Sequence, residues 1–287
     1  LDKTLFLIIS KSGNTIETLS NLLSLNIIKK NAKNIIIVSE KKNNVLYELS
    51  NKYNLFYVEH KNYIGGRYSV LSEVGLVPAF LMGLDTQKLR KNLKKYLSDK
   101  NKYFLKDSAI KISNMLLNSR FSNIIFLNYV PQLEKFLYWC QQLIAESLGK
   151  KGRGFLPVIS SAPKDHHSLL QLYLDGPKNK IFYIFSNEKK YPIKIKSKKL
   201  TNQMRYIHNK NLSEIKIAQK NAFIQSVKKK NIPYREFKIL NFNEDTLGEL
   251  FSYFMLEVVL VGKITNVNPF DQPAVEDVKI NTKKRLI

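Results

Sequence analysis

The sequence has a single cysteine, Cys140, among its 287 residues. One cysteine excludes an internal disulfide framework, and we expect a reducing, cytoplasmic setting. Cys140 stands in an apolar, aromatic stretch with helical periodicity, which favours a buried small hydrophobic residue over a reactive nucleophile. No apolar run approaches the length that a membrane-spanning helix needs, so we expect no membrane partner. Repeats of solenoid period are also missing, as are low-complexity tracts beyond the lysine bias.

Arginine is scarce in a strongly basic chain. The sequence has 47 Lys and Arg against 23 Asp and Glu, a net charge of +24, but only seven of the basic residues are arginine. Such a charge raises the hypothesis of a nucleic-acid-binding protein. Nucleic-acid sites favour arginine, however, and here lysines are scattered in pairs and triplets among many Asn and Ile residues. We interpret the charge as a solvated surface and expect no nucleic-acid partner.

Short apolar runs rich in β-branched residues alternate with helical patterns along the chain. Strands are predicted at 4–10, 34–39, 55–60, 123–129, 180–185 and 234–240, and helices at 15–30, 70–84, 108–118, 132–148, 167–174, 212–230 and 246–262. Several strands are apolar almost throughout, which is typical of parallel strands covered on both faces. The alternation predicts an α/β fold with doubly wound parallel sheets, whose ligands bind at the carboxyl ends of the strands.

The lysine-rich segment 85–104 separates two series of predicted strands. Its charge pattern predicts an exposed linking helix. We therefore expect a first domain at 1–104 that includes this helix, a second domain at 105–265, and a C-terminal active-site segment and helix at 266–287.

The first predicted strand runs directly into "SKSGNTIET", residues 10–18. Short hydroxyl side chains and the N–H groups of a helix start converge on a phosphate or carboxylate in many proteins. Alternatively, Thr15 or Ser12 caps the next helix and nothing more. These residues alone leave both interpretations open.

Two further stretches interrupt the core pattern. "GGRYSVLSEVG", residues 65–75, places Gly65 and Gly66 before Arg67. Paired glycines allow a ligand to approach the backbone, and arginine offers a planar cation, although a tight turn with a surface arginine has the same pattern. "ESLGK", residues 146–150, ends an apolar helix with Glu146, for which a solvated helix terminus is the alternative.

The remaining two stretches lie nearer the C-terminus. "DHHSLLQLYLDGP", residues 165–177, starts a predicted helix with two histidines. Adjacent histidines on a helix point about 100° apart and seldom chelate one ion, and no second set has matching spacing, so we expect no metal site. "NPFDQPAVEDVK", residues 268–279, places Gln272 and Lys279 two helical turns apart, which predicts that both share one helix face.

In this order the five stretches resemble the glucose-6-phosphate isomerase family, which is built from sugar isomerase (SIS) domains. The resemblance runs from about residue 4 to residue 280. It implies two SIS domains, a sugar-phosphate substrate and no cofactor. The implied reaction interconverts glucose 6-phosphate and fructose 6-phosphate through a cis-enediolate, in glycolysis and gluconeogenesis. It also implies a homodimer with shared active sites, because the family's catalytic histidine reaches the site from the neighbouring subunit.

The resemblance also implies a role for each motif residue. The implied catalytic residues are Glu146 as base and then acid between the two carbons, Arg67 as the cation beside the enediolate, His167 as the proton shuttle for ring opening, and Lys279 at the ring oxygen. The implied substrate-binding residues are Ser10, Lys11, Ser12 and Thr15 at the phosphate, and Gln272 at the sugar hydroxyls or phosphate. We expect His166 to orient its turn or to face solvent, and His60 and His208 to have packing or surface roles.

The sequence departs from the family at its start. The family has another glycine-rich phosphate loop upstream of the "SKSGNT" stretch, and this chain, which begins at Leu1, does not contain it. We therefore expect the first SIS domain to be incomplete at its N-terminus, in a longer protein or in a partial or decayed product. A non-catalytic sugar-phosphate-binding SIS module, an inactive fragment and a related sugar-phosphate isomerase stay open as alternatives.

Overall fold

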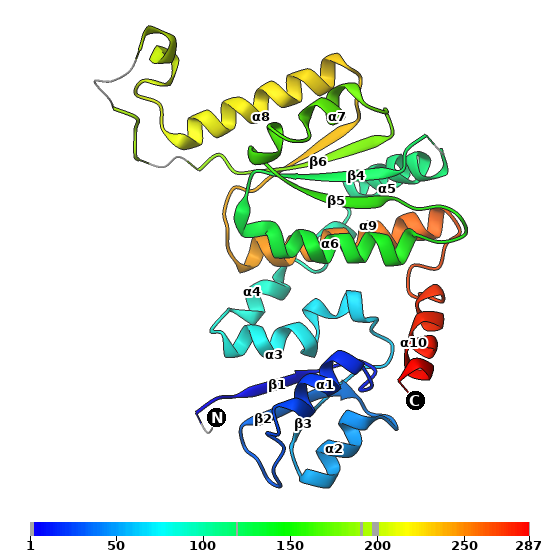
Figure 1. Ribbon diagram of the computed structural model, residues 1–287. Coiled ribbons are helices and arrows are strands. Elements are labelled where there is room, and N and C mark those ends of the chain that lie inside the picture. Colours follow the sequence, from blue (N-terminus) through cyan, green and yellow to red (C-terminus); the bar gives the residue numbers. More distant parts are fainter. Residues whose placement is uncertain (1–2, 119, 190–191, 197–200, 287) are drawn as a thin grey trace. The chain divides into compact units, whose positions relative to one another are not determined.

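The computed structural model describes residues 3–118, 120–189, 192–196 and 201–286 (Figure 1). The chain forms two compact units. The first comprises Leu1–Lys95 with Leu247–Tyr253, and the second comprises Tyr96–Thr246 with Phe254–Ile287. Among the described residues, each unit contains one parallel β-sheet.

The first unit is built on strands β1 (Phe6–Ile9), β2 (Ile35–Glu40) and β3 (Phe56–His60), in the order β1-β2-β3. Helices α1 (Ile16–Ser24) and α2 (Val45–Tyr53) connect them. Leu22 of α1 and Leu46 of α2 pack with Ile35 and Ile37 of the central strand in one apolar cluster. The short helix η1 (Gly66–Leu71) and helices α3 (Glu73–Leu81) and α4 (Thr86–Lys91) follow β3.

The second unit has strands β4 (Asn123–Asn128), β5 (Leu156–Ser161), β6 (Lys180–Ser186) and β7 (Tyr234–Lys238) in the order β5-β4-β6-β7. The chain moves from β4 to one side and then crosses to the other, which is the doubly wound arrangement. The helices bounded within or extending into this unit are η2 (Lys95–Leu97), α5 (Lys102–Leu117), η3 (Pro131–Leu133), α6 (Glu134–Leu148), η4 (Lys164–His166), α7 (Leu170–Asp175), η5 (Asn202–Ile207), α8 (Leu212–Lys229), α9 (Glu244–Ile264) and α10 (Ala274–Arg285).

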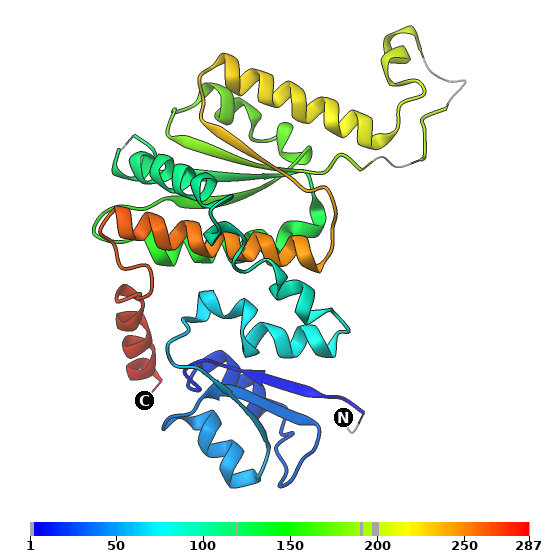
Figure 2. The same ribbon diagram turned by 180° about the vertical axis from the view of Figure 1, so that it is seen from behind.

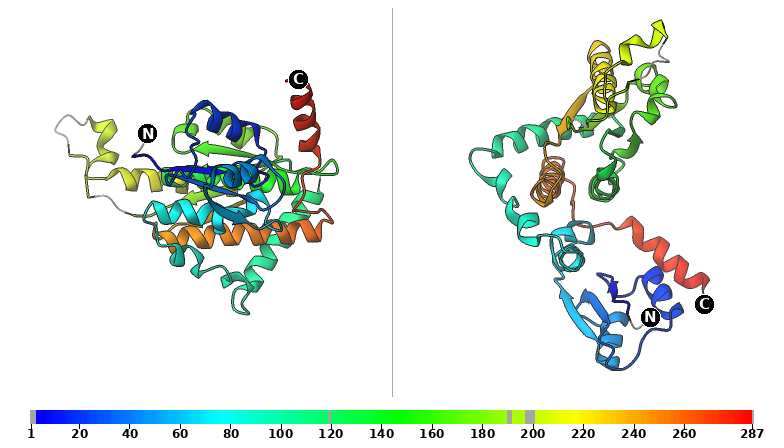
Figure 3. Two further views of the ribbon diagram at one scale, coloured as in Figure 1. Left: turned by 90° about the horizontal axis from the view of Figure 1, so that it is seen from below. Right: turned by 90° about the vertical axis from the view of Figure 1, so that its left-hand side faces the viewer.

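Both faces of the second sheet are covered by helices. Helices α7 and α8 lie on one face, and α6 lies beside α9 on the other (Figures 1 and 3). Phe182 of β6 packs with Phe223 of α8, whereas Phe185 of the same strand packs with Phe136 of α6 and Phe254 of α9. Because neighbouring side chains of a strand point to opposite faces, two covered faces require a strand that is apolar throughout.

A partly buried ion pair joins three elements of this unit. Arg235 of β7 donates from Nη1 to Glu257 Oε1 at 2.6 Å and from Nη2 to Glu257 Oε2 at 2.7 Å. Ser108 of α5 donates to Glu257 Oε1 at 2.6 Å, and α5 and α9 lie side by side when seen from behind (Figure 2). The guanidinium carbon of Arg235 lies 3.7 Å from the centre of the Tyr183 ring. The charges are therefore compensated by paired hydrogen bonds and by ring contact.

The predicted α/β class with parallel sheets is confirmed, and each predicted strand is present with small shifts at its ends. Strand β5 was not predicted. Its sequence, "LPVISS", is short, partly polar and contains Pro157, which usually argues against a strand. Pro157 is tolerated because β5 lies at an edge of the sheet and pairs with β4 alone.

Several helix predictions need correction. Helix α1 ends at Ser24 rather than at residue 30, and α2 was not predicted. The segment 85–104 is not one linking helix: it contains α4, η2 and the first residues of α5, and Leu89 within it is buried. The chain divides between Lys95 and Tyr96, whereas the expected boundary after residue 104 falls inside α5. No helix in the described ranges is long and apolar enough to cross a membrane.

We expect Arg235→Met to destabilise the second unit strongly. The substitution leaves the buried Glu257 carboxylate without its cation, which typically costs about 3–5 kcal/mol in the free energy of unfolding. Urea unfolding followed by the fluorescence of Trp139, the only tryptophan, measures the change. The matched control is Lys111→Met, which removes the exposed 2.7 Å pair with Asp107 and should cost about 0.5 kcal/mol or less. Equal losses in the two variants would contradict the prediction.

Candidate functional site

The loop after β1 is folded against the start of α2. The N–H of Gly13 donates to Ser10 O at 3.0 Å, and the N–H of Leu46 donates to Gly13 O at 3.2 Å. Gly13 has a φ of +67°, and a Cβ at this position would lie 1.8 Å from Asn44 Oδ1. Only glycine satisfies both the backbone angle and the close approach.

The first turn of α2 is fully capped by this arrangement. Asn44 Oδ1 accepts from Tyr47 N–H at 2.9 Å, and Asn14 Oδ1 accepts from Val45 N–H at 3.0 Å. With the bond from Leu46 to the loop, the N–H groups at the start of this helix have partners within the protein. The N-terminus of α2 is therefore used for folding.

The first turn of α1 is different. Thr15 stands at the N-cap position, but its side chain makes no capping hydrogen bond. Its hydroxyl lies instead 2.8 Å from Ser10 Oγ, and Ser12 Oγ accepts from Asn14 N–H at 3.3 Å. The capping interpretation is therefore wrong for both Thr15 and Ser12. The N–H groups at the start of α1 keep their capacity to bind an anion.

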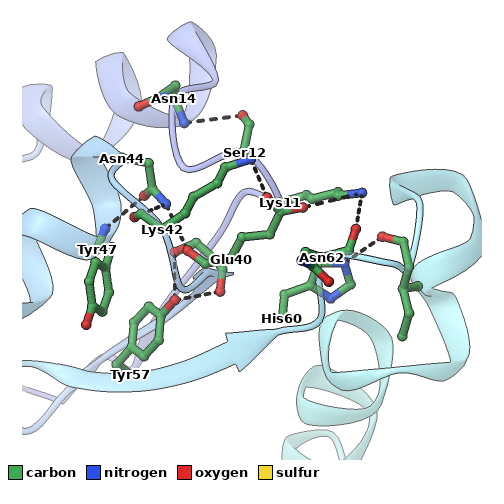
Figure 4. A network of polar contacts seen from close by, with 12 residues as sticks. Lys11, Ser12, Asn14, Glu40, Lys42, Asn44, Tyr47, Tyr57, His60 and Asn62 are labelled. Carbon is green, nitrogen blue, oxygen red and sulfur yellow. Dashed lines mark hydrogen bonds and ion pairs between the residues drawn. The ribbon is translucent and has the colours of Figure 1, made fainter. Parts of the chain in front are cut away.

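The Lys11 side chain points to Glu40 and to the segment that follows β3 (Figure 4). Its Nζ lies 3.4 Å from Glu40 Oε1 and donates to Asn62 O at 3.3 Å. Lys42 forms an ion pair with the other oxygen of Glu40. Burial alone would raise the pKa of Glu40, but hydrogen bonding and charge from Lys42 and Lys11 hold it below its usual range. Glu40 is thus an anion that orients Lys11 at the edge of the sheet.

Arg67 belongs to η1 and is buried, so it is not the surface arginine of the alternative interpretation. Its guanidinium carbon lies 5.4 Å from the centre of the Tyr68 ring, and Tyr68 N–H donates to Gly65 O at 2.9 Å. A Cβ at Gly66 would have no atom within 4 Å, and this glycine has no left-handed φ. The fold itself therefore does not require glycine at position 66.

Glu146 lies in the last turn of α6, in the second unit. Its side chain is half-buried, and its Oε1 accepts from Gln142 Nε2 at 3.1 Å. The helix ends directly afterwards at Gly149, where a Cβ would lie 2.5 Å from Ala145 O. The carboxylate is thus held at a defined helix end and is not fully solvated.

Lys150 fastens the segment around Gln272 to the end of this helix. Its Nζ donates to Asp271 O at 2.6 Å and to Asp271 Oδ1 at 2.7 Å, and it also donates to Asn268 O. The side chain is only 13% exposed. An ammonium group has three donors, so these contacts use all of them. Lys150 is an anchor for the loop between α9 and α10.

Asp165 fixes the turn that carries the two histidines. Its Oδ2 accepts from Ser160 Oγ at 2.9 Å and from Ser161 N–H at 2.8 Å. Both serines belong to the end of β5. His167 follows two residues later, exposed, between η4 and α7. The edge strand β5 therefore determines where the backbone of His167 lies.

His166 holds the same turn from its other side. Its Nε2 lies 2.7 Å from Tyr129 Oη, and its ring stacks on Phe223 with centres 5.8 Å apart. Burial, followed by the neighbouring His167, lowers the pKa of His166, while burial raises the pKa of Tyr129. Tyr129 therefore stays protonated and donates to the neutral ring. Of the two expected roles, His166 has the one of orienting its turn.

Gln272 and Lys279 do not share a helix face. Helix α10 begins at Ala274 after Pro273, so Gln272 precedes the helix and the prediction is wrong at this point. Proline at a helix start explains the difference, because it begins a helix more readily than it continues one. Lys279 is exposed and pairs with Glu276 Oε1 at 2.7 Å. Within the described ranges, no group of three or more His, Cys, Asp or Glu is placed to hold a metal ion.

Comparison with known proteins assigns the chain to a family. The family model "Phosphoglucose isomerase" matches residues 1–154, just over half of the sequence. The chain belongs to the phosphoglucose isomerase family.

Named relatives of this phosphoglucose isomerase family align with almost the whole chain. The "probable glucose-6-phosphate isomerase" of Methanococcus maripaludis is 36% identical over 291 residues, which cover 96% of this chain and 64% of that protein. The glucose-6-phosphate isomerase of Methanocaldococcus jannaschii is 34% identical over 295 residues, covering 97% of this chain and 71% of that protein. The chain thus spans about two thirds of the length of these relatives.

A solved structure with a similar fold comes from Thermus thermophilus. This hypothetical protein superposes with a TM-score of 0.88 at 26% identity, over 99% of this chain and 72% of that one. The agreement along nearly the whole chain supports the SIS-type α/β fold expected of a phosphoglucose isomerase family member.

The residues that hold the motifs in place were not predicted from the sequence. They are Glu40, Asn44, Lys150, Asp165 and Tyr129. Asn44 precedes an apolar pattern, and this N-cap signal could have predicted α2. The others have no such signal in the local sequence. Lys150, for example, resembles a solvated lysine in this lysine-rich chain. The implied catalytic and binding roles of the motif residues stay predictions.

We expect the stability of the second unit to depend on the protonation of His166. Because the pKa of His166 is lowered in the folded protein, the unfolded chain binds more protons as pH falls below about 6.5, the ordinary value. The contribution of neutral His166 to the free energy of unfolding is therefore fully present above that pH. It is lost as the pH falls toward the lowered pKa of His166 in the folded protein. Urea unfolding between about pH 5 and pH 8 should therefore show a steeper loss in the wild type than in His166→Leu. His208→Asn, at an exposed position, should keep the wild-type dependence. Parallel curves for the wild type and His166→Leu would refute this role.

Proposed function

We propose that the protein interconverts glucose 6-phosphate and fructose 6-phosphate through a cis-enediolate. The observation that carries the proposal is the similarity to proteins named glucose-6-phosphate isomerase along 96% or more of the chain. Those relatives are longer than this chain, which covers 64% and 71% of their lengths. The proposal therefore concerns the activity of the 287-residue chain itself. Three features of the two units support it.

The first feature is the loop 10–15, which we assign to the substrate phosphate. Ser10 and Thr15 place two hydroxyl groups 2.8 Å apart beside the start of α1, whose N–H groups are not capped by Ser12 or Thr15. Such a helix start favours an anion through its dipole and its free donors. Binding the phosphate here supplies energy remote from the reacting carbons, which positions the sugar.

The second feature is the pair of groups that we assign to the proton transfer. Glu146 takes the proton from C2 of the open-chain aldose and returns it to C1, so one carboxylate acts first as base and then as acid. Its half-buried position at a helix end gives it a fixed location. Arg67 stabilises the enediolate, because a buried guanidinium interacts more strongly with an anion than a solvated one.

The third feature is the anchored turn that carries His167, which we assign to ring opening together with Lys279. An imidazole exchanges protons near neutral pH and suits the transfer between the ring oxygen and the anomeric hydroxyl. The turn is fastened to β5 by Asp165 and to Tyr129 by His166. The exposed side chain of His167 is thus presented by a fixed backbone.

We expect Glu146→Gln to abolish turnover and to leave sugar-phosphate binding nearly unchanged. The amide keeps the size of the side chain but cannot accept the proton, so kcat should fall by about 100-fold to 10,000-fold. The assay supplies fructose 6-phosphate and follows glucose 6-phosphate through its NADP-dependent dehydrogenase. Calorimetric titration with fructose 6-phosphate measures binding. If the wild-type protein binds fructose 6-phosphate but does not convert it, the result would instead support the non-catalytic SIS module. If the wild type and Glu146→Gln turn over equally, Glu146 is excluded as the base.

We further propose a cytoplasmic homodimer in which each active site takes His167 from the other subunit. The single cysteine is buried and free, which suits a reducing compartment. A twofold dimer gives two equivalent shared sites.

Mixing two inactive variants tests the shared site. Glu146→Gln and His167→Leu, refolded together in equal amounts, form mixed dimers with one site that has both native residues. Turnover should then recover to about a quarter of the wild-type value, because half of the dimers are mixed and each has one competent site. Each variant refolded alone is the control. If the mixture stays as inactive as the separate variants while sedimentation shows dimers, the site is not shared.

A further inference from the structure

His60 is a buried histidine without an assigned role, and it lies next to the segment that leads to Arg67. It is the last residue of β3 and is 1% exposed. Its Nε2 lies 3.1 Å from Ile64 O, and its ring is directed at this segment (Figure 4). A carbonyl oxygen only accepts hydrogen bonds, so Nε2 carries the proton and donates.

The other ring nitrogen faces a carboxylate. His60 Nδ1 lies 3.8 Å from Glu73 Oε2, which belongs to the first residue of α3. Both atoms are buried, and neither has a hydrogen-bond partner among the described residues. Glu40 stands beside His60 in the register of β2 and β3, and Lys11 pairs with Glu40. Lys61, which pairs with Glu59 at 3.1 Å, adds further charge next to the ring.

The contact with Ile64 closes the turn between β3 and the two glycines. Ile64 N–H donates to Lys61 O at 3.1 Å, while Ile64 O is held by His60. Lys11 holds the same turn at Asn62 O. Gly65 follows directly, and the fold places no protein atom within 4 Å of a Cβ at Gly66. The direction of Arg67 therefore depends on how Ile64 is held.

We propose that His60 is a positioning residue for Arg67, acting through the hydrogen bond from Nε2 to Ile64 O. The effect of His60 on catalysis rests on the proposed function, in which Arg67 acts on the substrate. The effect of His60 on the conformation of the segment that carries Arg67 is independent of that function. Lys11, from the loop 10–15, donates to Asn62 O in the same turn. Residues 60–64 therefore connect the loop 10–15 to the segment that carries Arg67, and these are the two predicted anion-binding groups of this unit.

Three substitutions separate the hydrogen bond from simple packing. In His60→Gln, the side-chain N–H group can reach the position of Nε2 and donate to Ile64 O. In His60→Asn, the shorter side chain places its polar group near the position of Nδ1, and in His60→Leu no donor remains. Gln should therefore behave like the wild type, whereas Asn and Leu should behave alike. Asn keeps the test valid if the Leu variant does not fold.

The first measurement needs no substrate. Long-range ¹⁵N–¹H spectra of the imidazole rings of the full chain should show His60 protonated at Nε2 at neutral pH. Hydrogen exchange of the Tyr68 amide, which bonds to Gly65 O, should be faster by about 10-fold or more in the Asn and Leu variants. The Gln variant should exchange as the wild type does. Protonation at Nδ1 alone, or equal exchange in all four proteins, overturns the proposal.

The second measurement is the kinetic one. In the coupled assay, Asn and Leu at position 60 should lower kcat by about 10-fold to 100-fold with little change in KM, because a displaced Arg67 weakens the transition state more than the bound substrate. His60→Gln should stay within about threefold of the wild type, and His208→Asn is the control. Wild-type kinetics in the Asn and Leu variants overturn the catalytic part.

The two proposals fail in different ways. If the wild-type chain does not isomerise fructose 6-phosphate, the proposed function fails for this chain, and the exchange of the Tyr68 amide still tests His60. If the wild type isomerises and all three substitutions reduce kcat equally, the hydrogen bond is not the cause and the positioning role is overturned.

Discussion

The candidate site depends on one kind of interaction, in which a buried or half-buried polar side chain bonds to main-chain groups where a loop joins a strand or a helix. The loops that carry the motifs have no regular ladder to satisfy their N–H and C=O groups, so side chains must do so. Asn44 does this at the start of α2, Lys150 before α10, and Asp165 after β5. Each anchor joins a loop to a strand or helix whose position is set by apolar packing.

The apolar packing was largely predictable from the sequence, and its exceptions have identifiable causes. β6 is apolar on both faces because helices cover both, and continuous runs of this kind indicate buried parallel strands. β5 carries Pro157 and two serines, so its pattern resembles that of a loop, and the edge position that makes the proline tolerable is a tertiary feature. Helix boundaries were less predictable. Gln272 lies outside α10 because the helix begins only after Pro273. The seven-residue spacing of Gln272 and Lys279 predicts a shared face only if both residues lie in one helix, and spacing alone does not show where that helix begins.

The motif residues could be named from the sequence, but their anchors could not. Resemblance selects residues that the family's reaction requires, and it implies such roles for Glu146, Arg67 and His167. An anchor such as Lys150 can be recognised only from the hydrogen bonds of its ammonium group. These bonds go to Asp271 and Asn268, which are distant in the sequence. In a chain with 47 basic residues, a lysine that holds a loop has the same local sequence as one in solvent. Tertiary contacts alone distinguish them.

The two helix starts of the first unit differ in how their N–H donors are used. α1 and α2 both follow parallel strands of one sheet, so both N-termini lie at its carboxyl edge and both favour an anion. α2 has its donors satisfied by Asn44, Asn14 and the Gly13 carbonyl. The same loop that caps α2 turns the Thr15 hydroxyl toward Ser10 and leaves α1 without a side-chain cap. Folding the loop on one helix therefore leaves the start of the other without a side-chain cap, as the proposed phosphate site requires. This difference depends on Gly13, which alone permits the close approach to Asn44.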